Sequence, residues 1–183
     1  MKSFKKALLA LVAVFVIGCA HQGGPARPLS GPFIEGVPFF AQDEYMCGPA
    51  ALASVIGFYG ASEGMDEVAS EVYAEKLKGT LPMDLLIYAR EKGFDAKYFK
   101  GGMESLRESL VRGEPLILFL NLGYESYPVG HYVVAVGMDE KAGFVYAHSG
   151  MKKEERFTMK ELERSWSKTG YSTLLVKPKA GQK

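Results

Sequence analysis

The sequence predicts an α+β domain with its helices in the first half and an antiparallel sheet in the second. Between about residues 51 and 112, apolar residues recur mainly every three or four positions, which is the period of an α-helix. From residue 116 they gather in short β-branched and aromatic runs separated by turns, which is typical of strands. The chain has 183 residues, 48% apolar and 23% charged. These values are those of a globular protein with one core of ordinary size.

The first helix is predicted directly after Cys47-Gly48-Pro49. Proline is favoured in the first turn of a helix, where its missing N–H costs no hydrogen bond. The helix has one predicted buried face, because apolar residues recur at helical spacing: Ala51, Leu52, Val55, Ile56 and Tyr59. Cys47 is therefore expected at a helix N-terminus.

The remaining elements follow from the same two periods. Gly79 and Gly93 end two of the helices that follow. A continuous apolar run at 116–120 predicts a strand buried on both faces, and 131–136 and 144–148 predict a hairpin around the turn at 137–143. The predicted helices are 65–78, 83–92, 103–112 and 159–167, and further strands are predicted at 94–99 and 172–176.

The N-terminus has the pattern of an export signal. Three lysines precede an apolar run at residues 7–17, which ends at Gly18-Cys19 and is too short for an ordinary membrane span. Aliphatic-x-Gly-Cys resembles the bacterial lipobox, in which the cysteine is lipidated; the alternative is a plain signal with an incidental cysteine. We predict a signal peptide at 1–18, lipidated Cys19 with a flexible tether to residue 35, the domain at 36–178 and a tail at 179–183. Ala20 after the cysteine implies the outer membrane if the host has one.

Charge and composition narrow the class of partners. Residues 1–18 hold three lysines and no acidic residue, so the remainder has 19 basic and 21 acidic side chains and a net charge of −2. No dense basic patch of the kind that nucleic acid requires is visible. We therefore predict no nucleic acid partner. We also predict no cofactor and no metal. The oligomeric state is not indicated.

Cys47 is the predicted nucleophile. If Cys19 carries lipid, Cys47 is the only remaining thiol and cannot form an internal disulfide. A helix N-terminus lowers the pKa of a thiol, and the side-chain amide of Gln42, five residues upstream, is placed to line an oxyanion hole. The alternative is a buried, inert cysteine, which is common in protein cores.

His131 is the predicted general base. It stands at the start of a strand, after the loop 124–130, which is long enough to line a cleft. A histidine there, facing the N-terminus of a helix, is the arrangement that a Cys–His pair requires. A histidine considered alone is more often structural.

These residues resemble a known family. Val37-Pro38, Gln42, the run Cys47 to Leu52 and the run Gly130 to Val134 are similar to the papain-like peptidases that process bacteriocin leaders at double-glycine sites, cysteine peptidase family thirty-nine and its stand-alone relatives. The resemblance covers about residues 37–176. It implies a papain-like fold, a peptide or protein substrate, and catalysis by Cys47 with His131 as base and Gln42 in the oxyanion hole.

The sequence departs from that family at the third catalytic position. The family places Asp or Asn after the second strand of the hairpin, whereas this chain has Ala147-His148-Ser149-Gly150. Alignment puts Ser149 in the position of the acid, but we favour His148, because an imidazole accepts a hydrogen bond strongly. Alternate residues of a strand face opposite sides, so both cannot point into the cleft. Asn121 is a further candidate, and Asp139 is expected to be too distant.

Two other functions remain open. One is a cell-wall peptide amidohydrolase of the NlpC type, whose second histidine often stands about where His148 does. The other is a papain-like peptide-binding module that has lost its activity together with the acid. The substrate itself is not indicated by the sequence.

Overall fold

The computed structural model describes residues 30–42, 45–124 and 126–181. It confirms an α+β fold. The six strands form one antiparallel sheet in the order β1-β6-β2-β3-β4-β5. The helices are α1 (Cys47–Phe58), α2 (Met65–Val72), α3 (Pro82–Glu91), α4 (Met103–Val111) and α5 (Met159–Ser167), with a short 3-10 turn η1 (Glu75–Leu77). The strands are β1 (Asp95–Lys100), β2 (Leu116–Asn121), β3 (Gly130–Asp139), β4 (Phe144–Ser149), β5 (Lys152–Thr158) and β6 (Ser172–Lys177).

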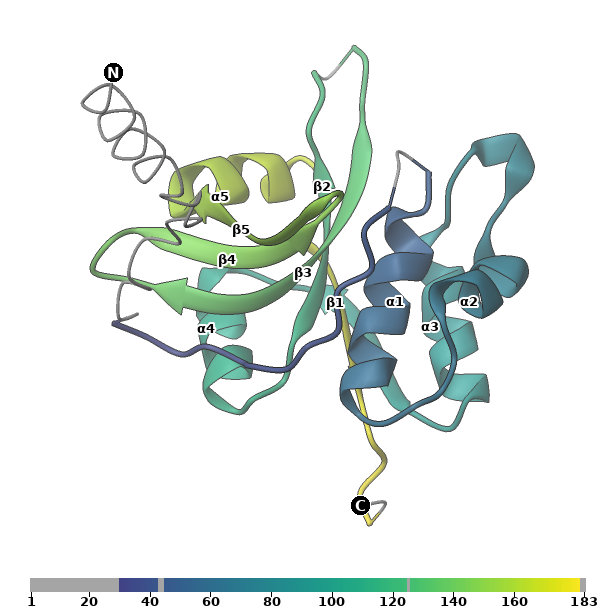
Figure 1. The fold of residues 1–183 in the computed structure, drawn as a ribbon. Helices are drawn as coiled ribbons and strands as arrows, with labels where there is room; N and C mark the ends of the chain where they lie inside the picture. The colour runs from purple at the N-terminus through teal and green to yellow at the C-terminus, as the bar shows by residue number, and fades with distance from the viewer. Residues whose placement is uncertain (1–29, 43–44, 125, 182–183) are drawn as a thin grey trace, which may run out of the picture.

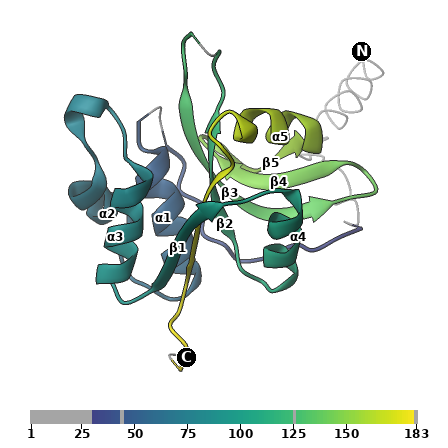
Figure 2. The ribbon, with the colours of Figure 1, turned by 180° about the vertical axis from the view of Figure 1, so that it is seen from behind.

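The helices lie in two groups about this sheet. Figure 1 shows α1, α2 and α3 together beside the sheet, and Figure 2 shows α4 and α5 on the face turned toward the viewer there. Helix α1 lies between its two neighbouring helices and the sheet, in contact with α2, α3 and β3. The start of α1 is thereby held at the end of the sheet where β3 begins.

Helix α1 is more deeply buried than its sequence predicts. We expected one buried face, whereas every residue from Cys47 to Ile56 is buried. A helix that is apolar on all sides belongs in a core, and CGPAALASVIGF has only one hydroxyl and no charge. That hydroxyl, of Ser54, donates to the Ala50 carbonyl at 2.8 Å, so it needs no external partner.

Two parts of the prediction are wrong. The helix expected at 65–78 ends at Val72, because Tyr73 adopts an extended conformation. An Ala74–Gly79 bridge then closes a small loop around η1, with Lys78 in a left-handed conformation (φ 47°). Strand β5 was not predicted. Its sequence, KKEERFT, is charged because it lies at the edge of the sheet, where charge discourages pairing with other chains.

The predicted N-terminal signal, Cys19 and the first part of the tether lie outside the described residues. In the part of the chain that is described, no helix is long and apolar enough to cross a membrane.

Helix α5 begins with a capping box. The Thr158 hydroxyl accepts from the Glu161 backbone N–H at 3.1 Å, and a Glu161 carboxylate oxygen accepts from the Thr158 N–H at 3.1 Å. Helix α5 carries Trp166, which is fully buried and donates to the Ser172 carbonyl at 3.0 Å. The cap therefore fixes the start of a helix that packs on one face of the sheet.

We expect Thr158→Ala to lower the free energy of unfolding by about 1 kcal/mol, because the Glu161 N–H loses its acceptor. Urea unfolding followed by circular dichroism measures the change. Ser167→Ala is the matched control, since that exposed hydroxyl bonds only the Arg164 carbonyl within the last turn of the same helix. Equal effects of the two substitutions would show that the cap contributes nothing of its own.

Candidate active site

Cys47 is the first residue of α1 and lines a cleft of about 790 Å³. The chain enters the helix through Met46, whose carbonyl accepts from the Ala50 N–H at 3.0 Å. Gly48 is packed so tightly that an added Cβ would lie 2.9 Å from the Thr80 side chain. This close approach holds the start of α1 against the loop that follows η1.

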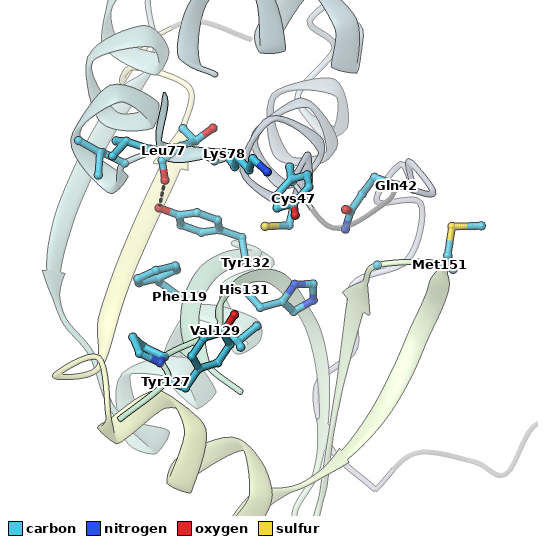
Figure 3. Close-up of a pocket in the computed structure, with 17 residues that line it drawn as sticks. Gln42, Cys47, Leu77, Lys78, Phe119, Tyr127, Val129, His131, Tyr132 and Met151 are labelled. Atoms are coloured by element: carbon cyan, nitrogen blue, oxygen red, sulfur yellow. Dashed lines mark hydrogen bonds between the residues drawn. The ribbon is translucent and has the colours of Figure 1, made fainter. Parts of the chain in front are cut away.

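His131 lines the same cleft from β3, where it is the second residue and lies opposite Leu120 of β2. Cys47 and His131, 84 positions apart in the sequence, are thus brought to one cavity, as Figure 3 shows. No direct hydrogen bond joins the two side chains in this structure, although both are among the described residues. Catalytic hydrogen bonds are often long in ligand-free enzymes, so this spacing is compatible with a working pair.

Gln42 lies in the same cleft, beside Cys47 (Figure 3). The residue is buried, and its backbone N–H donates to the Gly150 carbonyl at 3.3 Å. Its side-chain amide makes no hydrogen bond to any described residue. The backbone is therefore fixed, while the amide N–H groups remain available to a ligand in the cleft.

Ser149, rather than His148, contacts the His131 ring. The Ser149 hydroxyl lies 3.0 Å from Nε2 of His131. His148 points to the opposite face of the sheet, where its Nδ1 accepts from the Glu154 backbone N–H at 3.2 Å and its Nε2 donates to the Val37 carbonyl at 3.1 Å. Our preference for His148 as the partner of His131 is therefore wrong, because both of its ring nitrogens are engaged elsewhere.

Asn121, the other candidate, does not orient His131 either. Its side-chain oxygen accepts from the backbone N–H groups of Gly123 and Val129, at 2.9 and 3.0 Å. It closes the β2–β3 loop that forms one wall of the cleft. Asp139 lies at the far end of β3, where it accepts from the Ser30 hydroxyl and the Ala142 N–H.

Burial disfavours the charged form of both members of the pair. It raises the pKa of the Cys47 thiol above its usual value, although backbone hydrogen-bonding groups of Tyr132 and Gly48 act in the opposite direction. It also lowers the pKa of His131, against the field of Glu155. The helix N-terminus alone predicted a depressed thiol pKa, and that prediction is wrong for the resting site because desolvation outweighs it.

The cleft wall includes residues that the sequence analysis did not single out. Tyr132 follows His131 on β3, and its hydroxyl donates to the Thr80 carbonyl at 3.0 Å (Figure 3). Large apolar side chains are exposed on both rims of the cleft: Tyr45, Leu77, Leu81, Tyr127, Val129 and Met151. The sequence signal for these rim residues was an apolar side chain in a loop. Only the fold shows that the loops line one cavity.

A metal site is not visible in the described ranges 30–42, 45–124 and 126–181. No three side chains of His, Cys, Asp or Glu type are grouped there so that they could hold an ion. The chemistry available to the cleft is that of a thiol, an imidazole, an amide and apolar surface.

Residues 34–174 match the family described as Peptidase C39 like. The chain belongs to this family. It is similar to the lactococcin-G-processing and transport ATP-binding protein LagD of Lactococcus lactis subsp. lactis, with 31% identity over 144 residues. That match covers 79% of this chain but 19% of the transporter, so the chain spans about a fifth of that relative's length.

Solved C39 domains have the same fold. The peptidase domain of Streptococcus ComA, a bifunctional ABC transporter of a quorum-sensing pathway, superposes with a TM-score of 0.66 at 21% identity, covering 79% of this chain and all of that one. A double-glycine-motif protease of an AMS/PCAT transporter, solved with its leader peptide, gives 0.62 at 26% identity, covering 81% and 95%. The predicted papain-like fold is therefore confirmed.

We expect iodoacetamide to alkylate Cys47 of the free protein more slowly at pH 7 than it alkylates free cysteine. The rate should rise only above about pH 8.5, where an ordinary thiol ionises, because burial disfavours the thiolate. Mass spectrometry of the labelled peptide follows the reaction, and Cys47→Ser is the blank for any label elsewhere. A half-maximal rate below pH 8.5 would show instead that the resting site stabilises the thiolate.

Proposed function

We propose that this domain is a cysteine peptidase, in which Cys47 is the nucleophile, His131 the general base and Gln42 an oxyanion-hole donor. The observation that carries the proposal is the position of Cys47 and His131 in one cleft, in a chain that belongs to a peptidase family. Gln42 supports it, since its unbonded amide lies in the same cavity beside the start of α1.

The proposed reaction starts from the neutral pair. Nε2 of His131 is engaged by Ser149, so Nδ1 is the nitrogen that takes the Cys47 proton as the sulfur attacks the peptide carbonyl. The Gln42 amide and the Cys47 backbone N–H stabilise the oxyanion. The imidazolium then protonates the leaving amine, which leaves a thioester. Water, deprotonated by His131, hydrolyses the thioester and restores the thiol.

The substrate that fits the cleft is an extended or helical peptide with apolar side chains. Both rims are apolar, and Lys78 is the one formally charged side chain among the described lining residues. Since one relative processes lactococcin G and another was solved with a leader peptide at a double-glycine motif, we propose a leader of that type as the first substrate to test.

A non-catalytic peptide-binding module is the second candidate, and a specific observation favours it. A hydroxyl stands at the end of β4 where the family carries an acid, and burial leaves the Cys–His pair uncharged. By contrast, no observation in the cleft favours a cell-wall amidohydrolase. The two candidates differ in a single respect, which is whether the bound peptide is cut.

Cleavage of a synthetic leader with a Gly-Gly site, followed by mass spectrometry, separates the candidates. We expect Cys47→Ala to abolish cleavage but to retain binding, and Gln42→Ala to lower kcat by about 10²- to 10³-fold. His131→Ala should cost at least 10²-fold. If the wild type and Cys47→Ala bind the leader equally and neither cuts it, the domain is a binding module.

We also propose that the domain is exported and anchored through lipidated Cys19. The support is the signal-like segment and the position of its cysteine. In the native host, Cys19→Ser should move the protein out of the detergent phase in a phase-partition assay. The matched control is Cys47→Ser, which also removes one thiol but should leave partitioning unchanged. An unmodified, freely soluble wild-type protein would contradict the anchor.

A further inference from the structure

The carboxylate that is missing from the end of β4 has a counterpart on β5. In an antiparallel pair, residues directly opposite each other share a face of the sheet. Glu155 lies opposite Ala147, and Ala147 lies opposite Ala135 of β3. Alternation along β3 and β4 then places His131 and Ser149 on that same face. The 3.0 Å contact between His131 and Ser149 agrees with this assignment.

A β-bulge brings Glu155 to this face. Ser149 pairs with Lys152, so a regular ladder would place Glu154 opposite Ala147, but the register shifts and Glu155 takes that position. Glu154 absorbs the extra residue in a left-handed conformation (φ 54°). Its backbone N–H is held by Nδ1 of His148. Without the bulge, the Glu155 side chain would point to the other face.

Glu155 is placed to act on His131 by its charge. Its side chain is 23% exposed, and Lys152, which is 70% exposed, donates to it at 2.5 Å. The other ionisable groups that line the cleft with His131 are Cys47, Lys78 and three tyrosines, Tyr45, Tyr127 and Tyr132. None is a carboxylate, and Glu155 is the carboxylate among the described residues whose field acts on this ring.

We infer that Glu155 is a positioning residue of this site: its carboxylate stabilises the His131 imidazolium from β5, while Ser149 orients the ring. The roles that one acidic side chain commonly combines are thereby divided between a hydroxyl in contact with the ring and a charge one strand away. The inference rests on the proposed function, because the imidazolium forms when His131 takes the Cys47 proton.

The test is a titration of the His131 ring by NMR, which needs no turnover. The chain has three histidines, and His131→Gln assigns the signal. We expect Glu155→Gln to lower the pKa of His131, because a stabilising negative charge is lost. Lys152→Gln should raise it, because the cation that partly neutralises Glu155 is removed. The matched control, Glu154→Gln, removes the same charge one residue away and should lower the pKa of His148 instead, since Glu154 acts on that ring.

Kinetics give the second readout where the leader is cut. In Glu155→Gln the acid limb of kcat/KM should move to lower pH, and kcat should fall by less than about tenfold, well short of the loss in His131→Ala. An unmoved His131 titration in both the Glu155 and Lys152 variants would overturn the inference, even if the domain is an active peptidase. Shifts in the expected directions with no cleavage by the wild type would support the electrostatic role of Glu155 and overturn the proposed peptidase instead.

Discussion

The burial of the first turn of α1 governs the chemistry of this domain. Ten consecutive residues of that helix are buried, and Cys47 is the first of them. Removing a group from water penalises its charged form, which makes the thiol a weaker acid and the adjacent imidazole a weaker base. The helix dipole and nearby N–H groups favour the thiolate, but they act on a group that has already lost its hydration. Burial therefore favours the uncharged pair, and in the proposed reaction the proton moves only when a peptide is present.

The parts of the site that could be predicted are those with a signal in the local sequence. Cys47 and His131 stand at the junction between a turn and a regular element, and each junction is visible in the local sequence. Gln42 was found by its spacing from the cysteine. The partner of the His131 ring was not found, because the choice between His148 and Ser149 depends on which face of β4 meets the site. A shift of one residue along β4 exchanges its two faces, and two adjacent polar residues give no local signal of which face meets the site.

Strand β5 was missed for a related reason. Its lysines, glutamates and arginine give no apolar alternation, since an edge strand is stabilised by pairing with β4 rather than by its own burial. At the shift in its register, the Glu154 backbone N–H donates to Nδ1 of His148, a contact that is set by tertiary structure. His148 also donates to Val37 and packs edge-on to Phe39, with ring centroids 5.4 Å apart. It thus joins the segment that leads to Gln42 to the bulge that orients Glu155.

Orientation and charge stabilisation need not come from one side chain. A hydrogen bond acts only within about 3 Å and fixes direction, whereas the Coulomb interaction falls with the first power of distance and tolerates a longer separation. A hydroxyl at 3.0 Å can therefore hold the His131 ring while a carboxylate on the next strand supplies the field. The arrangement stabilises the imidazolium less than a carboxylate in direct contact would, because Glu155 is partly exposed and shares its charge with Lys152. The weaker field agrees with a pair that is uncharged at rest, and it makes the register of β5 as important to the site as the identity of Ser149.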